Sequence, residues 1–502
     1  MACLFGYFGP PAEGLLARMA GLLAHRCPLG WERLDAPMAG EQRVEIGHGI
    51  ASWCRESQLA VGDKQALGYG GVLFSADINE NVAGATQAER LLSNLKHNPA
   101  TEFQRLEGAF VLASAQHDTG YLIRDHAGVK VVYWTLHQGR LLFASEIKAL
   151  FADPTVPRQL RPGALPEYLT FSFIPGPRTM LMGIEELQPG CILTFSQRQV
   201  RIHRHFHYEL LEETASDDNY PQQVRTALEE SVRDCLAVNP GKTPAVFLSG
   251  GIDSSAVLAV TSQQLPEVRI PTFSVHFGAE YARENEFVVL MVERYRTDHH
   301  WLEIRPAHFL EQLRDIIWKL DDPIGDPVAV PNYLLAQTAA QVTDCVLNGE
   351  GGDPCFGGPK NIPMLLTRLY GPLPNEPTDG WLERDYLRSF QRCYQDLNTL
   401  LTPDVFRESG GDESLIGIVK PFFHTARPRD FVNKLMHMNI RLKGANLILV
   451  KVDKMSSANG LLALPPLFSK RIIETSMRCP PGLKLEGAVE KSVLKKAVYD
   501  LI

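Results

Sequence analysis

The sequence predicts an α/β protein of two domains, in which a two-layer, β-rich α+β domain precedes a domain built on a parallel sheet. Short strand-like segments separated by turn residues fill residues 1–207. From residue 224 to residue 502, apolar strands alternate with helices, which is typical of a parallel sheet covered on both faces. The acidic, apolar-poor segment 208–223 is therefore interpreted as the linker between the domains.

The N-terminal domain contains a first strand at the start of the chain and eight further segments with the composition of β-strands. Turn residues separate them, as expected for two packed β layers. The segments are 43–50, 70–76, 108–115, 119–125, 131–136, 140–145, 191–196 and 199–206.

The C-terminal domain begins with an alternating pattern and ends with a mostly helical third of the chain. The alternation predicts strands at 244–249, 271–277, 299–304 and 344–349. The helices predicted between them are 254–265, 284–297, 306–320 and 332–342.

The composition argues against several functional classes. A net charge of -8 without a Lys/Arg-rich block gives no support for a nucleic-acid partner or an anionic membrane surface. The nine cysteines form no C-x-x-C pair, which disfavours a disulfide framework or a zinc site and favours the reducing cytoplasm. No apolar run reaches the ~20 residues that span a bilayer, and the first basic residue, Arg18, comes too late for a signal peptide.

The most specific motif is "AVFLSGGIDSSAVLAV" at 245–260, an apolar strand, a glycine turn and the start of a helix. Glycines allow backbone N–H groups to approach a ligand, and the helix N-terminus favours an anion. Asp253 adds a carboxylate suited to Mg²⁺ on a polyphosphate. A plain strand–turn–helix with a capped helix is the simpler alternative, but the complete string favours a phosphate loop.

A second motif, "LNGEGGDPCFGG" at 347–358, also follows an apolar strand. Both loops are therefore expected at the carboxyl ends of parallel strands, where α/β sheets bind ligands. Glu350 is a candidate general base, and Asp353 is a candidate second carboxylate for the metal.

These motifs resemble those of glutamine-hydrolysing asparagine synthetases and their relatives, including the β-lactam synthetases, almost end to end. The first loop is similar to the pyrophosphate loop of ATP pyrophosphatases. "FGYFG", "LEGAFVLA", "RDHAGVKVVYW" and "FASEIKAL" resemble the family's glutaminase domain, and "VKVDKMSSANG" and "PPGLKLEGAVEKSVLKKA" resemble its synthetase domain. The resemblance implies an Ntn-hydrolase-like domain followed by an ATP-pyrophosphatase domain of the adenine nucleotide α-hydrolase-like type.

The resemblance also implies ATP and Mg²⁺ as cofactors and assigns roles to residues. Asp253 and Asp353 would hold Mg²⁺, Glu350 would deprotonate the incoming amine, and Lys491 would stabilise charge on the acyl and phosphate oxygens. The residues implied to bind the nucleotide are Leu248, Ser249, Gly250, Gly251, Asp253, Ser254, Ser255, Val275 and Gly349.

The start of the chain departs from the family, in which a cysteine after Met1 becomes the terminal nucleophile and its α-amine the base. Here Ala2 takes that position and Cys3 takes the place of the following glycine. Cys3 would carry an amide nitrogen instead of a free amine, so we expect it to be a small, half-buried hydrophobe on the first strand.

Other glutamine-binding positions depart as well. They no longer carry the family's arginine, amide or carboxylate, so we expect the glutaminase domain to be inactive. These positions are Ile50, the segment 69–74 whose last residue is Phe74, Thr86 or Gln87, and the segment 25–29 whose last residue is Leu29.

In the synthetase half, Leu462 and Leu464 replace a family glutamate and arginine, which makes the pocket poorly suited to a small, doubly charged acid such as aspartate. The chain reaches Ile502 within an apparent helix soon after Lys491, so the sequence leaves open whether this end is natural.

We therefore expect an ATP-dependent, AMP-forming ligase that adenylates a carboxylate and couples it to an amine, in specialised small-molecule biosynthesis. Asparagine synthesis from aspartate and a non-catalytic family member are the alternatives. The expected partners are small-molecule carboxylate and amine substrates, with a homodimer expected only by analogy.

Overall fold

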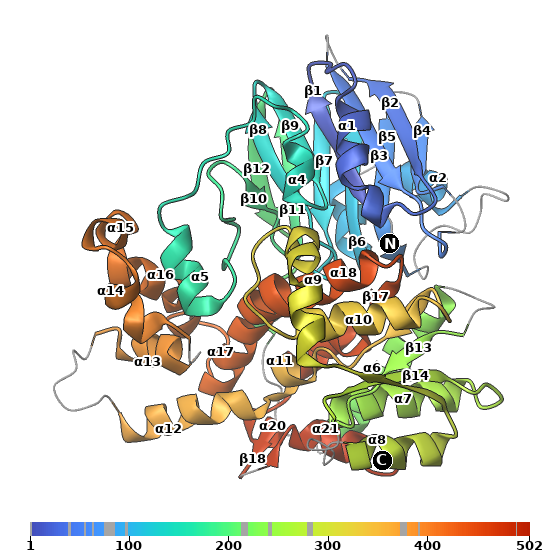
Figure 1. The fold of residues 1–502 in the computed structure, drawn as a ribbon, viewed down its shortest axis with the longest axis vertical. Coiled ribbons are helices and arrows are strands. Elements are labelled where there is room, and N and C mark those ends of the chain that lie inside the picture. The colour runs from blue at the N-terminus through green and yellow to red at the C-terminus, as the bar shows by residue number, and fades with distance from the viewer. Residues whose placement is uncertain are drawn as a thin grey trace.

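A computed structural model describes the fold of residues 3–38, 42–54, 57–62, 65–74, 86–95, 99–211, 219–238, 243–278, 285–371, 379–389, 392–487 and 489–502. Within these ranges the chain forms two domains, stacked one above the other in Figure 1. Met1 and Ala2 lie outside the described residues. Ala2 takes the position at which the resemblance places the nucleophile.

The N-terminal domain is built on two six-stranded antiparallel sheets, as the strand pattern predicts. The first sheet has the order β10 (Glu185–Glu186), β8 (Tyr133–His137), β9 (Arg140–Ala144), β1 (Leu4–Gly9), β3 (Arg43–Gly49), β2 (Trp31–Pro37). The second has the order β12 (Gln199–Arg204), β11 (Cys191–Ser196), β7 (Thr119–Arg124), β6 (Gly108–Gln116), β5 (Gln65–Leu73), β4 (Leu59–Gly62).

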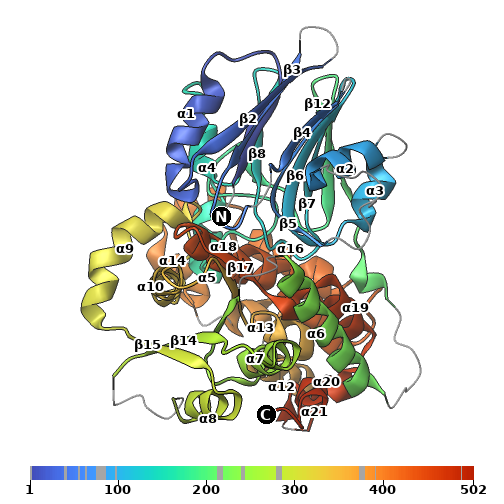
Figure 2. The same ribbon diagram turned by 90° about the vertical axis from the view of Figure 1, so that its right-hand side faces the viewer.

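The two sheets pack face to face, because strands such as β1 carry apolar side chains on both faces. Leu4 and Phe8 enter the core between the sheets, whereas Phe5 and Tyr7 pack under α1 (Leu15–Leu22). Figure 2 shows α1 outside the first sheet and α2 (Gln87–Asn94) with α3 (Pro99–Arg105) outside the second. The remaining helices of this half are α4 (Ile147–Leu150) and α5 (Ala164–Phe171).

The C-terminal domain contains a five-stranded parallel sheet, also as predicted. Its order is β15 (Asp298–Glu303), β14 (Pro271–His276), β13 (Ala245–Phe247), β16 (Cys345–Leu347), β17 (Leu462–Leu464). The helices before and between its first four strands are α6 (Tyr220–Ala237), α7 (Ile252–Gln264), α8 (Asn285–Tyr295), α9 (Pro306–Leu320) and α10 (Ala329–Ala339).

The last third is helical, as the pattern indicates, apart from β17 and a small hairpin of β18 (Leu485–Glu486) and β19 (Val489–Glu490). Its helices are α11 (Gly352–Phe356), α12 (Ile362–Tyr370), α13 (Trp381–Ser389), α14 (Leu397–Leu400), α15 (Pro403–Glu408), α16 (Gly411–Phe423), α17 (Phe431–Met438), α18 (Leu449–Ser457), α19 (Lys470–Arg478), α20 (Pro481–Lys484) and α21 (Ser492–Ala497). A π-helical segment, η7 (Asn439–Ile448), joins α17 to α18 in one continuous rod.

Three expectations from the sequence need correction. α6 begins at Tyr220, so residues 220–223 belong to a helix of the C-terminal domain and not to the linker. α21 ends at Ala497, so the helical pattern does not continue to Ile502. Leu462 and Leu464 lie on β17, whose pairing with β16 buries both side chains in the core. Among the described residues, no helix is long and apolar enough to cross a membrane.

Candidate active site

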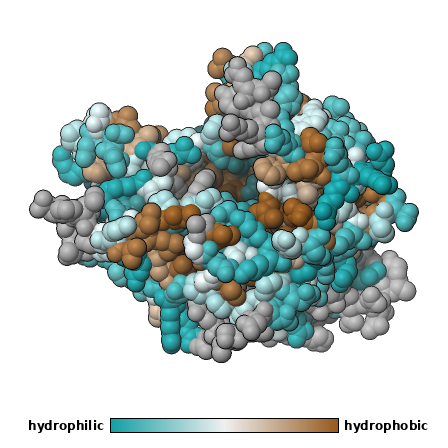
Figure 3. Space-filling model, turned by 90° about the horizontal axis from the view of Figure 1, so that it is seen from below, coloured by the Kyte–Doolittle hydropathy of each residue, from teal (hydrophilic) through white to brown (hydrophobic). Residues whose placement is uncertain are grey.

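A cleft of about 830 Å³ opens at the carboxyl ends of β13, β14 and β16, where a parallel sheet is expected to bind ligands. Its lining comes from α7, α8, α10 and α18 and from Lys491, just before α21. Seen from below, the molecular surface is hollowed, and apolar side chains lie around the hollow (Figure 3). The residues predicted from the sequence that line the cleft are Leu248, Ser249, Gly251, Asp253, Ser254, Val275, Gly349, Glu350 and Lys491. Three predicted residues do not line the cleft: Gly250 and Ser255, which belong to the first loop, and Asp353, which belongs to the second.

The first loop holds its shape through hydrogen bonds among its own serines. The backbone N–H of Ser249 donates to Ser254 Oγ at 3.1 Å, and the Ser249 and Ser254 hydroxyls lie 3.1 Å apart. Gly250 has φ 77°, a left-handed conformation that glycine adopts without strain. α7 starts immediately afterwards at Ile252, so the N-terminus of a 13-residue helix lies at the cleft.

The second loop packs so closely against the first that it requires glycine. A Cβ on Gly349 would lie 2.6 Å from the backbone N of Ser254, and a Cβ on Gly352 would lie 2.1 Å from Asp253 Oδ1. Any other residue would push the two loops apart. The glycines of "NGEGGD" therefore bring Glu350 and Asp353 to the mouth of the phosphate loop.

Lys491 joins the two loops. Its Nζ lies 2.6 Å from Asp253 Oδ2 and 2.6 Å from Asp353 Oδ1. Burial acts to lower the pKa of Lys491, but the two carboxylates outweigh this effect and raise it, so the ammonium stays charged. The residue caps α21 with φ 53° and ψ 32°, a strained conformation for a lysine of the kind found at functional sites.

Glu350 lies on the same wall of the cleft. Its backbone N–H donates to Asn348 Oδ1 at 3.0 Å, which fixes the turn that carries the carboxyl group. Burial raises the pKa of Glu350, Asp253 and Asp353 raise it further, and Lys451 opposes them. A carboxyl group with a raised pKa is a stronger base once it is ionised.

The residues at this cleft fit a magnesium nucleotide. Asp253 Oδ1 is buried and has no hydrogen-bond partner among the described residues. Two carboxylates that converge on one ammonium also supply the oxygen ligands that Mg²⁺ prefers. Burial raises the pKa of Asp253, and the charge of Lys491 opposes this effect.

The remaining walls were not predicted from the sequence. The motif "VKVDKMSSANG" covers most of α18, but no site role was assigned to its residues, and α10 carries no recognisable motif. Val328, which precedes α10, Pro331 of α10 and Val452 of α18 are apolar, while Asn332 and Ser456 add neutral polar groups. Lys491 is the single lysine or arginine among the described residues that line the cleft. Leu462 and Leu464 do not line it, so their replacement of charged residues does not act on the cleft directly.

In the N-terminal domain, the positions of the expected glutamine site serve packing. Cys3 is completely buried, not half-buried as expected, and its Sγ lies 3.0 Å from Cys27 Sγ. A Cβ on Gly49 would collide with both sulfur atoms, so the two cysteines fill the space beside this glycine. All nine cysteines lie within the described ranges and are free thiols.

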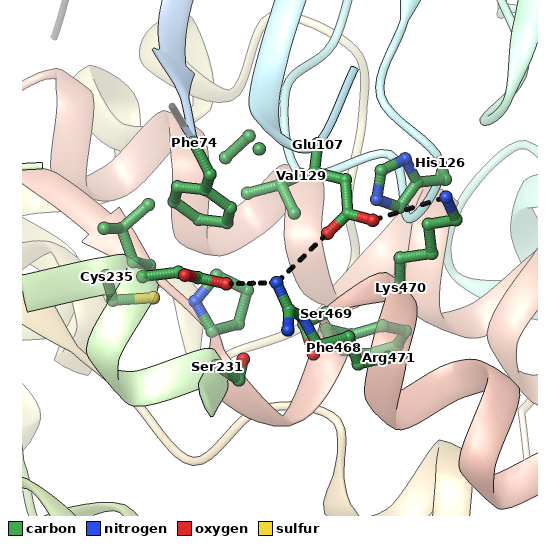
Figure 4. A pocket seen from close by; sticks show the side chains of 15 residues that line it. Phe74, Glu107, His126, Val129, Ser231, Cys235, Phe468, Ser469, Lys470 and Arg471 are labelled. Atoms are coloured by element: carbon green, nitrogen blue, oxygen red, sulfur yellow. Dashed lines mark hydrogen bonds and ion pairs between the residues drawn. The ribbon is translucent and has the colours of Figure 1, made fainter. Parts of the chain in front are cut away.

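Other positions of the expected glutamine site also have structural roles. Thr86 caps α2 through a reciprocal pair of hydrogen bonds with Glu89. Gln87 accepts a hydrogen bond from Tyr69 and donates one to the carbonyl of Leu73. Phe74 lines a small cavity at the junction with the C-terminal domain (Figure 4).

Comparison with known proteins agrees with this geometry. The family model "Asparagine synthase" matches residues 223–502, and the model "Glutamine amidotransferase domain" matches residues 75–206. The chain therefore belongs to the asparagine synthase family, a family of carbon–nitrogen ligases. Its two domains are an N-terminal antiparallel-sheet domain of the Ntn type and a parallel-sheet domain of the ATP-pyrophosphatase type.

Named relatives span most of the chain. "Asparagine synthetase [glutamine-hydrolyzing] 1" of Bacillus subtilis is 25% identical over 83% of this chain and 69% of its own length. "Putative asparagine synthetase [glutamine-hydrolyzing]" of Mycobacterium tuberculosis is 25% identical over 98% of this chain and 82% of its own length. "Amidase chry2" of Gibberella zeae is 27% identical over 55% of this chain and 43% of its own length.

Proposed function

We propose that this protein is an AMP-forming ligase that adenylates a carboxylate and joins the acyl group to an amine. The observation that carries the proposal is the contact of Lys491 with both Asp253 and Asp353, in front of a phosphate loop and beside Glu350. A structural ion pair alone would not explain why a strained lysine and two glycine-rich loops meet at one cleft.

Each residue then has a defined task. The backbone of 249–254 and the N-terminus of α7 would bind the phosphates, and Asp253 with Asp353 would hold Mg²⁺. ATP would supply the adenylyl group: a carboxylate oxygen of the acid would bond to the α-phosphorus, and the β- and γ-phosphates would leave as pyrophosphate. Lys491 would stabilise the negative charge that grows on phosphate and acyl oxygens. Glu350 would take the proton from the attacking amine nitrogen while AMP leaves the acyl carbon.

We further propose that the N-terminal domain releases no ammonia from glutamine. The support is the replacement of the glutamine-binding positions and the complete burial of Cys3, whose nitrogen lies within the chain and cannot serve as an α-amine base. The amine would then be free ammonia or a group of the substrate, as in relatives with an inactive glutaminase domain. Such an enzyme belongs in specialised small-molecule biosynthesis.

The acid substrate is proposed to carry a neutral, largely apolar group instead of a second carboxylate. Lys491 is already neutralised by two aspartates, and the described walls from α10 and α18 offer apolar and neutral polar side chains. A second carboxylate buried there would lack a counter-charge and would be costly to desolvate.

Pyrophosphate exchange tests the proposal. Full-length protein with ATP and Mg²⁺ is given L-aspartate, L-glutamate, hexanoate, phenylacetate and their amino-acid analogues, each with and without ammonium or hydroxylamine. Exchange that depends on an acid supports adenylation, and the fastest acid identifies its chemical class. If no acid induces any ATP turnover, the proposal is wrong and a non-catalytic role replaces it.

Asparagine synthesis is the second candidate, because the named relatives that cover most of the chain are asparagine synthetases. It requires L-aspartate to be the best acid of the panel and asparagine to be the product. Release of glutamate from glutamine above background would further favour this candidate over ours.

A further inference from the structure

A buried cluster of charges joins the two domains at α18, inside the motif "VKVDKMSSANG". Asp453 Oδ1 accepts a hydrogen bond from Lys130 Nζ at 2.8 Å, and Asp453 Oδ2 accepts one from Arg26 Nη2 at 3.0 Å. Both cations belong to the N-terminal domain. The three side chains are 1%, 3% and 2% exposed, so water screens none of them.

The cluster extends on both sides of the domain junction. Arg26 also contacts Glu146, which in turn pairs with Lys148. Lys454, the next residue on α18, donates to the hydroxyl of Tyr133 at 3.0 Å. Burial acts to raise the pKa of Asp453, but Lys130 and Arg26 outweigh it and lower that pKa, so the carboxylate stays ionised.

The helix that carries Asp453 is also a wall of the cleft. Val452 and Ser456, which are four residues apart and therefore share one face of α18, line the cleft. Lys451 extends toward the segment that precedes α10, where its Nζ lies 2.6 Å from Asp326 Oδ2. Figures 1 and 2 place α18 where the two domains meet, so one helix contacts the N-terminal domain and the ligand-binding space.

We propose that Arg26 and Lys130 of the N-terminal domain hold Asp453 so that α18 presents Val452 and Ser456 correctly to the acid substrate. Asp453 is thus a positioning residue, and a domain that no longer supplies ammonia is retained because it completes the synthetase cleft. This inference rests on the proposed function, since it assumes that an acid binds beside α18.

The physical reason is the directional nature of a buried ion cluster. An apolar contact tolerates sliding, whereas a carboxylate held between a guanidinium and an ammonium has few equivalent positions. Breaking a buried pair leaves uncompensated charge, so α18 would move or admit water to relieve it. Either response alters the wall formed by Val452 and Ser456.

The same domain junction contains a second ion cluster that provides a matched control (Figure 4). Glu107 belongs to the N-terminal domain, and its two partners are on α19. Its Oε1 lies 3.3 Å from Lys470 Nζ, and its Oε2 lies 3.8 Å from Arg471 Nη2. It resembles Asp453 in being one carboxylate shared by two cations across the junction. α19 does not line the cleft, so Glu107→Gln breaks the contact without altering a cleft wall.

A second control matches the burial of Asp453. Glu186 is a buried carboxylate that pairs with Arg124 and accepts a hydrogen bond from Asn446 of η7 at 3.0 Å. η7 contributes no residue to the lining of the cleft. Glu186→Gln therefore reports what the loss of a buried charge does to stability alone.

The experiment measures acid-dependent pyrophosphate exchange by the full-length protein, with the acid of the panel above that is fastest for the wild type. For Asp453→Asn we expect kcat/KM for the acid to fall about tenfold, mainly through KM, with KM for ATP unchanged. Lys130→Met combined with Asp453→Asn removes one excess cation and should show the same loss in a more stable protein. Glu107→Gln and Glu186→Gln should leave kcat/KM for the acid unchanged.

The outcomes distinguish this inference from the proposed function. If the wild type shows no exchange with any acid, the proposed function fails and this inference fails with it. If the wild type is active and Asp453→Asn binds the acid normally, only the positioning role is overturned. If Glu186→Gln loses acid affinity equally, or if both Asp453 variants fail to fold, the cluster serves stability and the proposal is wrong.

Discussion

The two domains of this molecule differ in the side chains that occupy their expected active sites. In the N-terminal domain, the positions expected to bind glutamine hold packing and capping residues, such as Cys3, Phe74 and Thr86. At the C-terminal cleft, charged groups converge at short distances: the largely buried Lys491 and Asp253 pair there, and the more exposed Asp353 contacts the same ammonium from the edge of the cleft. Burial of unpaired polar groups is costly, so such groups persist where they serve a function.

The comparison supports our proposal that the N-terminal domain is retained for its contacts with the C-terminal domain and not for glutamine hydrolysis. The N-terminal domain keeps both complete sheets and contributes residues to the core that it shares with the C-terminal domain, among them Trp53 and Val129. Four predictions test this contrast, ordered from the largest expected effect to the smallest.

Lys491→Ala should reduce acid-dependent pyrophosphate exchange by about 10³-fold, because it removes the charge that balances phosphate and acyl oxygens. The control is Lys495→Ala on α21, the helix that follows Lys491. It breaks a part-exposed ion pair, in which Lys495 Nζ lies 3.0 Å from Glu490 Oε1. That change should keep the rate within about twofold. Equal rates for the wild type and the Lys491 variant would show that Lys491 has no role in the reaction at the C-terminal cleft.

Glu350→Gln should slow amide formation about 10²-fold while leaving pyrophosphate exchange within a few-fold of the wild type. Burial raises the pKa of Glu350, so the wild-type rate of amide formation should fall on acidification at a pH above the ordinary carboxyl range. The variant should lack this acidic limb. A variant that loses exchange and amide formation equally would mean that Glu350 is not the base.

Acidification should destabilise the N-terminal domain through His48. Burial lowers the pKa of His48 to about 4. Between pH 6.5 and pH 4, this imidazole is therefore protonated in the unfolded chain but neutral in the folded chain. The free energy of unfolding therefore begins to fall below pH 6.5, is lower by about 2 kcal/mol at pH 5, and stops falling below pH 4. Urea unfolding at pH 7.5 and pH 5 measures this decrease, and His48→Gln should reduce the difference in unfolding free energy by about 2 kcal/mol. Part of the pH dependence should remain, because burial also lowers the pKa of His126 to about 3. An equally large difference in the variant would mean that His48 does not contribute.

Cys3→Ala should have the smallest effect, with ligase rates unchanged and stability reduced by about 1 kcal/mol for the small cavity left beside Cys27. Glutamate release from glutamine should stay at background in both proteins, and ammonium should support the same product yield. A variant that loses glutamine-dependent but not ammonium-dependent activity would show that Cys3 is a nucleophile after all.

The sequence by itself determined the fold class, the two glycine-rich loops and the placement of their carboxylates on one edge of a parallel sheet. These features are local, because strand alternation and glycine turns are set by neighbouring residues. Only the family resemblance indicated Lys491 as a site residue. It lies 238 positions from Asp253 and caps a short helix whose sequence has no distinctive pattern.

Only the tertiary structure decided which side chains meet. It buried Leu462 and Leu464 in β17, away from the cleft, and made α10 and α18 the walls beside Glu350. It brought Arg26 and Lys130 to Asp453 from more than 300 positions away in the chain, a pairing that no local pattern encodes. Packing of two complete domains fixes such contacts, because each buried charge must find its partner wherever the fold places one.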